Sequence, residues 1–144
     1  MDKYDCLKIE NQLCFPLYVA SKEVIRKYKP ILDQFDLTYT QYIAMMVIWE
    51  EKQIKVTELG NRLYLDTGTI SPLIRKLKDK QYITITRDIN DERVQIINLT
   101  EQGAKLREQA VQIPNEMMKS NCINLSKEEA IELKRLLEKV INIE

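Results

Sequence analysis

The segment Val56–Thr100 constrains the fold more than any other part of the chain, because it combines two periodicities in a fixed order. Apolar residues recur at helical spacing from Val56 to Leu65 and again along Ile70–Leu77, with a short turn between the two stretches. The segments 83–87 and 94–98 then alternate with a period of two, as paired strands do. A helix sized for the major groove, followed by a two-stranded ribbon, is the layout of a winged helix-turn-helix DNA-binding domain.

Helical patterns occupy most of the remaining chain. The predicted helices are Leu7–Gln34, with Pro16 and Pro30 as kinks or near its ends; Tyr39–Glu50, capped by Thr38; a helix that starts after Thr100 and runs towards Pro114 or past it; and a last helix from Ser126 to Ile143, which opens with a capping box to Glu129. The expected fold class is therefore mainly α with a small β wing (α+β).

We expect a single winged helix-turn-helix domain over residues 1–144, with a DNA-binding head at 54–99 and its wing at 83–98. The terminal helices, at 7–34 and 115–144, carry apolar faces that one chain would struggle to cover. They predict a dimerisation region and a twofold homodimer, which would read two half-sites about one helical turn apart. The alternative is a monomer that buries both apolar faces internally.

Composition narrows the classes of function. The chain has no His and only three scattered Cys, so a zinc site, a Ser-His-Asp triad and a Cys-His dyad are all excluded. Its three Gly stand alone, which leaves no phosphate-binding loop. We therefore expect that the protein binds no metal ion and no cofactor, and that it is not an enzyme. No apolar run reaches membrane-spanning length and no signal peptide is recognisable, so a cytoplasmic protein without a membrane partner is expected.

Charge is distributed unevenly along a chain whose net charge is zero. Between Ile54 and Arg87 there are seven cations against three anions, whereas the flanking segments are faintly acidic. This local excess favours double-stranded DNA as the partner of the head. Some of these cations could instead simply solvate a helix face.

The second helix of the head should carry the DNA contacts. Leu65–Thr69 is predicted as a turn in which Gly68 lets the backbone bend tightly, and Asp66 or Thr67 can cap the helix that follows. Small hydroxyls then lie near its N-terminus and cations follow one turn later, and the predicted DNA contacts are Thr67, Thr69, Ser71, Arg75 and Lys76. Ordinary capping and a solvated face are the alternatives.

The wing tip combines acidic and basic residues. Arg87 and Arg93 are predicted DNA contacts, with a guanidinium held out towards the minor groove. Asp91 and Glu92 suit a phosphate-facing loop poorly, so we expect them to brace these arginines. The alternative is that Arg93 only stabilises the hairpin through ion pairs.

The residues around Cys14 are compatible with two roles for its thiol. A free thiol is most often a small buried hydrophobe. Pro16, however, suits a first helical turn and would place Cys14 near a helix N-terminus, where an anion is favoured, and Tyr18 lies one turn on with a hydroxyl to donate. These two hints leave redox sensing and packing equally open.

The wing pattern Asp88-x-x-Asp91-Glu92-Arg93, followed by a strand and Leu99-Thr100-Glu101-x-Gly103, closely resembles the MarR family of bacterial regulators. Further motifs resemble the OhrR branch, the organic-hydroperoxide sensors: Leu13-Cys14-Phe15, Tyr18, Tyr28-Lys29-Pro30, Leu37-Thr38-Tyr39-x-Gln41-Tyr42, Trp49-Glu50 and Leu63-Tyr64-Leu65-Asp66-x-Gly68-Thr69. The similarity covers nearly the whole chain and is weakest after Pro114.

This resemblance implies roles for the cysteines and tyrosines. Cys14 would be the peroxide-reactive thiol, with Tyr28 and Tyr39 of the partner subunit hydrogen-bonded to it and Tyr18 as a further pocket residue. Cys122 would resolve the oxidised Cys14 as an intersubunit disulfide, although it could also be a chance cysteine in a loop. Cys6 has no expected role.

The function expected from the residues and the resemblance is that of a redox-sensing, homodimeric repressor. It binds a pseudo-palindromic (inverted-repeat) operator and is released when oxidants such as organic hydroperoxides oxidise Cys14 and join it to Cys122. One alternative is a regulator gated by a small phenolic or quinone ligand in a pocket that Tyr18, Tyr28, Tyr39 and Tyr42 would line. The other is a thiol peroxidase.

Overall fold

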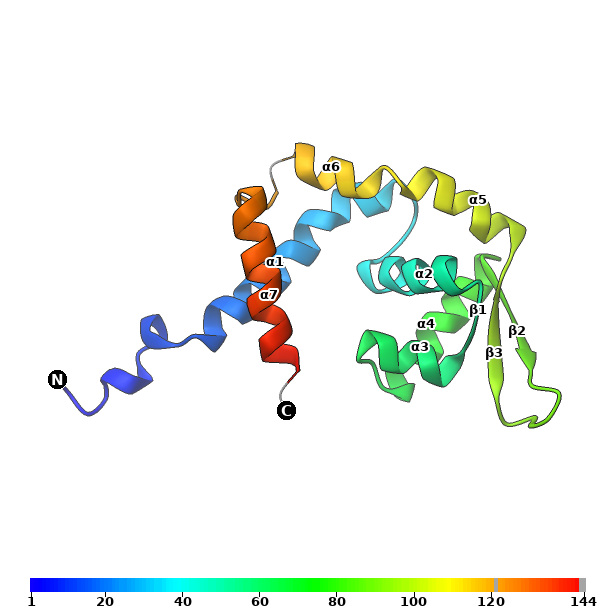
Figure 1. The fold of residues 1–144 in the computed structure, drawn as a ribbon, viewed down its shortest axis with the longest axis horizontal. Helices are drawn as coiled ribbons and strands as arrows, with labels where there is room; N and C mark the ends of the chain where they lie inside the picture. Colours follow the sequence, from blue (N-terminus) through cyan, green and yellow to red (C-terminus); the bar gives the residue numbers. More distant parts are fainter. Residues whose placement is uncertain (121, 143–144) are drawn as a thin grey trace.

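The computed structural model describes residues 1–120 and 122–142 (Figure 1). Its elements follow in the order α1 (Cys14–Asp33), α2 (Tyr39–Glu51), β1 (Gln53–Lys55), α3 (Val56–Leu63), α4 (Thr67–Asp79), β2 (Ile83–Arg87), β3 (Gln95–Leu99), α5 (Glu101–Ala110), α6 (Ile113–Lys119) and α7 (Lys127–Ile141), with two short 3₁₀ turns, Asp5–Leu7 and Ile9–Asn11, ahead of α1. The predicted end of the last helix, Ile143, lies outside the described residues.

The head is built from α2, α3 and α4 against a small antiparallel sheet with strand order β1-β3-β2. Ile97 of the central strand β3 lies opposite both Ile54 and Ile85 and is fully buried. Strand β2 has the predicted bounds, and β3 begins at Gln95, one residue later than expected. β1 was not predicted, because three residues are too few to show a period of two.

Side-chain caps set the starts of most of these helices. Thr38 and Ser126 each form a complete capping box, with Gln41 and Glu129 respectively, which confirms both expectations. The Oγ1 of Thr100 accepts from the backbone N–H of Gly103 at the start of α5. Each cap satisfies backbone donors that would otherwise lack a partner.

The turn between α3 and α4 differs from the prediction. The Asp66 carboxylate accepts from the N–H of Thr69 at 2.9 Å, so α4 already begins at Thr67. The left-handed residue is Tyr64, at φ 56°, and Gly68 is an ordinary helical residue. The expected tight bend at Gly68 is therefore wrong, and Thr67 and Thr69 belong to the first turn of the recognition helix.

Helix α1 starts at Cys14 rather than at Leu7. Pro16 lies in its first turn, where a missing N–H costs nothing, and Pro30 lies in its last two turns. The expectation that both prolines lie near helix ends is confirmed. Cys14 is consequently the first helical residue of α1, as Pro16 predicted.

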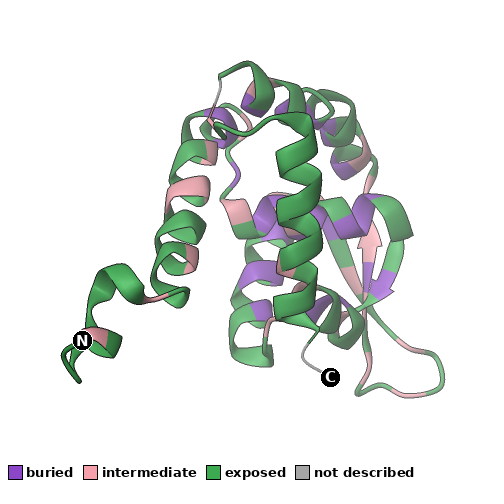
Figure 2. Ribbon diagram, turned by 60° about the vertical axis from the view of Figure 1, so that its left-hand side comes forward, coloured by how far each residue is buried: buried purple, intermediate pink, exposed green. Residues whose placement is uncertain are grey.

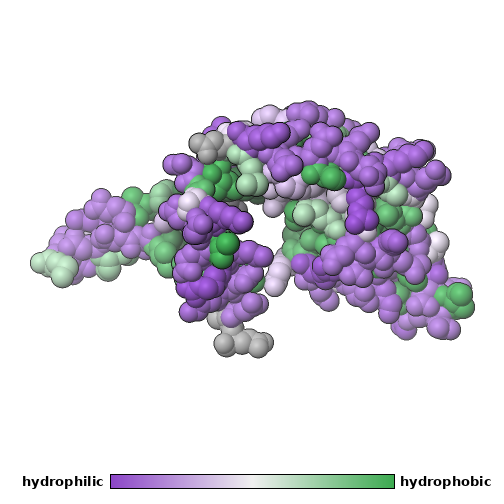
Figure 3. Space-filling view, turned by 45° about the horizontal axis from the view of Figure 1, so that its top comes forward, coloured by the Kyte–Doolittle hydropathy of each residue, from purple (hydrophilic) through white to green (hydrophobic). Residues whose placement is uncertain are grey.

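Helices α1 and α7 lie at the end of the molecule away from the wing (Figure 1). None of the residues of α7 is buried, and the ribbon of this helix is almost entirely green, the colour of exposed residues, in Figure 2. Large apolar side chains are exposed on both helices: Phe15, Tyr18, Val19 and Ile25 on α1, and Ile131, Leu133, Leu136, Val140 and Ile141 on α7. Figure 3 shows hydrophobic side chains at the surface of this part of the molecule. A monomer that buries both stripes internally does not fit these exposures. Among the described residues, no helix is both long and apolar enough to cross a membrane.

Candidate nucleic-acid interface and thiol site

Recognition helix α4 has one buried and one exposed face. Ile70, Leu73, Ile74 and Leu77 are buried in the head, which fixes how the helix is rotated. The opposite face exposes all five of the α4 residues predicted to contact DNA, namely Thr67, Thr69, Ser71, Arg75 and Lys76. A helix held by its apolar stripe can present this polar face to a groove of DNA without rearrangement.

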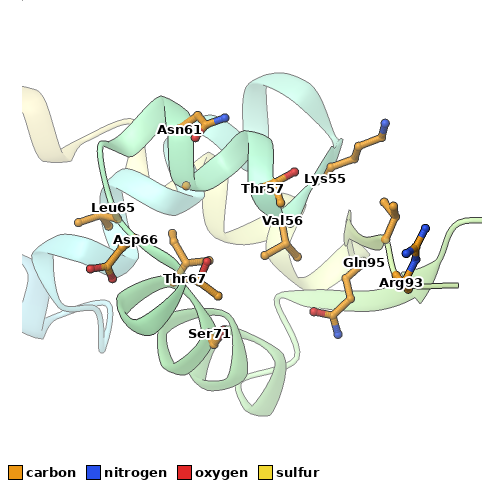
Figure 4. A pocket seen from close by; sticks show the side chains of 13 residues that line it. Lys55, Val56, Thr57, Asn61, Leu65, Asp66, Thr67, Ser71, Arg93 and Gln95 are labelled. Carbon is orange, nitrogen blue, oxygen red and sulfur yellow. The ribbon is translucent and has the colours of Figure 1, made fainter. Parts of the chain in front are cut away.

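A groove of about 520 Å³ lies between α3, α4 and the wing (Figure 4). Thr67 and Ser71 line it from α4, and Arg93 lines it from the wing. A second groove, of about 290 Å³, continues along α4 past Ser71 and Arg75 to Lys78. The two grooves share Val56, Ser71 and Gln95, so they are neighbours along the polar face of α4.

Sequence reasoning missed several polar residues that line these grooves, namely Lys55, Asn61, Lys78 and Gln95. The alternation along β3 gave no signal for Gln95, because the period of two places it on the same face as the buried Ile97. Lys55 belongs to the unpredicted strand β1 and was marked only as one of the seven cations of the head.

The wing holds its arginines through local contacts. Asp91 binds Arg93 through two side-chain hydrogen bonds of 3.1 and 3.3 Å, and this guanidinium lowers the pKa of the Asp91 carboxyl. The Arg93 side chain nevertheless stays 91% exposed. Arg87 donates to the backbone carbonyl of Glu92 at 3.2 Å, so the contact involves the Glu92 backbone and not its carboxylate. An exposed guanidinium fixed at its base is suited to reach into a groove.

Two of the seven cations counted for the head are turned to internal partners. Lys80 donates to the buried Gln41 side chain at 2.9 Å and to the carbonyl of Asp36. Arg62 pairs with Glu50 and Glu51 of α2. The basic surface that remains for a nucleic acid is therefore concentrated on α4 and at the edges of the two grooves.

Three tyrosines form a cluster where α1 meets α2. The Tyr28 ring lies 5.1 Å from Tyr39 and 5.9 Å from Tyr42, centroid to centroid. Burial raises the pKa of Tyr28, and it raises that of Tyr42 to about 12. Both hydroxyls therefore keep their protons at neutral pH and can act as hydrogen-bond donors.

The structure does not bring Cys14 to these tyrosines within one chain. Cys14 is exposed at the start of α1, beside the 60% exposed Tyr18, and Tyr28 follows fourteen residues later on the same helix. At 1.5 Å per residue, the two are about 20 Å apart along the helix axis. Only another subunit could place a Cys14 against this cluster.

Cys122 occupies a different place. The ammonium of Lys27 donates to its carbonyl at 2.6 Å, so Cys122 is tied to α1. It is half-buried against the hydrophobic core, whereas Cys6 is exposed. All three cysteines are free thiols, and over residues 1–120 and 122–142 no group of Cys, Asp or Glu side chains is arranged to hold a metal ion.

Comparisons with known proteins agree with this architecture. The family model described as transcriptional regulator SarA/Rot matches residues 26–110. The chain is 43% identical to the organic hydroperoxide resistance transcriptional regulator of Bacillus subtilis, over 94% of this chain and 88% of that protein. It is also 43% identical to the regulator SarZ of Staphylococcus saprophyticus, over 93% of this chain and 90% of that protein.

Solved structures show the same fold bound to DNA. Overoxidised AbfR bound to DNA aligns with a TM-score of 0.79 at 26% identity, covering 99% of this chain and 100% of that chain. Reduced AbfR bound to DNA aligns with a TM-score of 0.74 at 29% identity, covering 97% of this chain and 98% of that chain. A mutant MarR of E. coli complexed with operator DNA aligns at 0.82 and 25%, covering 97% and 99%. The polar recognition helix, the wing and these matches lead to one conclusion: the chain belongs to the MarR/SarA type of DNA-binding transcriptional regulators.

Proposed function

We propose that this regulator is a homodimeric, redox-sensing repressor, released from an inverted-repeat operator when Cys14 is oxidised and joined to Cys122 of the partner subunit. The observation that carries the proposal is the position of the two thiols. Lys27, the neighbour of Tyr28 in sequence, ties Cys122 to α1 of its own chain, and Cys14 lies at the start of the same helix, about 20 Å from Tyr28 along its axis. A twofold dimer formed by the terminal helices α1, α6 and α7 can bring one chain's Cys14 to the other's cluster.

Peroxide chemistry at Cys14 would proceed in a simple order. The Cys14 thiolate attacks the terminal oxygen of a hydroperoxide, the S–O bond forms, the O–O bond breaks, and the alkoxide leaves and takes up a proton to become an alcohol. The hydroxyls of the partner's Tyr28 and Tyr39 are suited to donate to the sulfur before attack and to the sulfenic acid afterwards. Condensation with Cys122 then stops oxidation at a reversible stage.

Disulfide formation would act on DNA through geometry. Two sulfurs must come within about 2 Å, which requires backbone movement wherever the reduced thiols lie farther apart. Because the terminal helices also set the separation of the two α4 helices, this movement would alter the half-site spacing that the operator requires. AbfR occurs on DNA both reduced and overoxidised, which favours the crosslink, and not the added oxygen atoms, as the releasing event.

The direct test is operator binding before and after treatment with an organic hydroperoxide. Peroxide is expected to abolish binding by the wild type and to leave Cys14→Ser bound. Oxidised wild type should run as a covalent dimer on non-reducing gels and yield a Cys14–Cys122 linked peptide in mass spectrometry. Cys6→Ser is the matched control and should respond as the wild type does. Equal release of wild type and Cys14→Ser would refute the cysteine switch.

The contacts proposed for α4 are tested in the reduced protein. Arg75→Ala should weaken operator binding by about 10-fold and, if the contact is to a phosphate, lower the slope of log affinity against log salt by about 1. The control is Lys105→Ala, which removes an exposed cation of α5 that lies outside both grooves. Fluorescence anisotropy on a labelled operator across a salt series measures both quantities. Equal effects of the two substitutions would mean that Arg75 contributes only bulk charge.

Gating by a small ligand is the second candidate, because an apolar groove of about 270 Å³ borders the tyrosine cluster. Tyr42, Met46 and Trp49 line it from α2, and Val111 lines it beyond α5. Phenolic and quinone compounds would suit such a surface by stacking. Titrating them against operator binding in Cys14→Ser separates this candidate from the thiol switch, since only a ligand can release that variant.

A further inference from the structure

Ser120 and Lys27 both form hydrogen bonds to Cys122, although neither belongs to a motif of the sequence analysis. The Ser120 Oγ lies 2.6 Å from the Cys122 Sγ and also donates to the carbonyl of Met117 at 3.1 Å. The Lys27 ammonium, from the middle of α1, donates to the Cys122 carbonyl at 2.6 Å. One contact therefore fixes the sulfur and the other fixes the backbone of the same residue.

The Lys27 contact fastens the segment after α6 to α1. Residues 122–126, between α6 and α7, form no helix or strand, so no hydrogen bonds of regular secondary structure hold this segment in place. The hydrogen bond from Lys27 crosses 95 positions of sequence and ties the segment to the helix that carries Tyr28. Cys122 is thereby kept against α1, where the proposed function requires the partner's Cys14 to arrive.

The Ser120 hydroxyl can serve the sulfur in both of its protonation states. While the thiol is protonated, its S–H can donate to Ser120 Oγ, and the hydroxyl keeps its own bond to Met117. Once the proton has left, the hydroxyl can rotate and donate to the thiolate instead, because a serine hydroxyl is both donor and acceptor. The Cys122 sulfur thus has a hydrogen-bond partner before and after ionisation, and the Cys122 side chain can keep the same orientation in both states.

We propose that Ser120 and Lys27 are positioning residues for Cys122, which hold its sulfur ready to resolve the partner's oxidised Cys14. This inference rests on the proposed function. In the step they assist, the Cys122 thiolate attacks the sulfenic sulfur of Cys14, the S–S bond forms, and the S–O bond breaks. Hydroxide leaves and takes up the proton that Cys122 released, giving water. No further oxidant is needed, because the hydroperoxide has already supplied both oxidising equivalents.

The value of this positioning lies in the rate of closure relative to overoxidation. If the resolving thiol is not held in place, the sulfenic acid can react with a second hydroperoxide before the disulfide forms. The product is a sulfinic acid, which most cells cannot reduce. A misplacement of about 1 Å at a reacting group can cost about 100-fold in rate. Loss of either contact should therefore slow disulfide closure without touching the oxidation of Cys14 itself.

The experiment follows the two steps separately in the full-length protein. Rapid mixing with an organic hydroperoxide, quenched with dimedone, measures sulfenic acid formation, and quenching with a thiol-blocking reagent before non-reducing gels measures the covalent dimer. Ser120→Ala and Lys27→Met should form sulfenic acid within 2-fold of the wild-type rate but close the disulfide at least about 10-fold more slowly. Excess hydroperoxide should then increase their sulfinic fraction.

Conservative variants and a neighbouring control distinguish positioning from general damage. Ser120→Thr and Lys27→Arg keep the donors and should recover most of the closure rate. Lys29→Met removes a cation of α1 that pairs with Asp33, away from Cys122, and should close as the wild type does. Closure at the wild-type rate in both Ser120→Ala and Lys27→Met would overturn the inference and leave the proposed function standing. Absence of any Cys14–Cys122 peptide in oxidised wild type would overturn both.

Discussion

Leu136→Asp is expected to dissociate the dimer and to reduce operator affinity by at least about 100-fold. Leu136 lies in the middle of the apolar stripe of α7, a helix with no buried residue in the isolated chain. In a twofold dimer each substitution occurs twice, and an unpaired carboxylate in an apolar interface costs about 3 kcal/mol or more, which corresponds to about 100-fold in an equilibrium constant. A monomer would read one half-site only. Sedimentation velocity at micromolar protein and anisotropy on the operator measure the two effects.

Lys139→Asp is the matched control, because it introduces the same residue into the same helix away from the stripe. It should remain dimeric and bind the operator within about 2-fold of wild type, since surface substitutions of this kind change stability by at most about 0.5 kcal/mol. A dimeric Leu136→Asp with wild-type affinity would show that α7 lies outside the interface. Its exposed leucines would then need another partner.

The fold could largely be predicted because its signals are local. The period of two predicted the bounds of strand β2 and those of β3 to within one residue, and the Thr38 cap and the Ser126/Glu129 capping box predicted two helix starts. The errors occurred where local rules compete. Gly68 suggested a bend, but the carboxylate of Asp66 had already capped the helix.

The site could be predicted only in part, because its contacts join distant segments. Cys14, the tyrosines and the wing were found through short motifs, each contained within a few residues. Lys27 and Cys122 are 95 positions apart, and no periodicity links a lysine in α1 to a coil residue after α6. Lys80 was counted as a free cation of the head for the same reason, since its partners, Asp36 and Gln41, precede it by about forty residues.

Gly103→Ala is expected to destabilise the protein by about 3 kcal/mol, and to lower its melting temperature by about 10 °C, because the position has no room for a methyl group. A Cβ on Gly103 would lie 2.3 Å from the carbonyl oxygen of Tyr82 and 2.7 Å from Leu99. Tyr82 is backbone held between strand β2 and the left-handed Gln81, so it cannot move aside cheaply. The Gly103 carbonyl also accepts the buried Trp49 indole N–H at 2.9 Å, and a shift of α5 would leave that donor unpaired.

Gly68→Ala provides the control that separates a lack of space from the chemistry of alanine. The nearest atom to a Cβ there is the Asp66 Oδ1 at 3.5 Å, an ordinary contact, and the residue is helical. Alanine loses less chain entropy than glycine in a helix, so stability should stay the same or rise by less than about 1 kcal/mol. Thermal and urea unfolding of both variants give the comparison. If Gly103→Ala had the same melting temperature as Gly68→Ala and the wild type, α5 would have to lie farther from the backbone of Tyr82 than the structure places it.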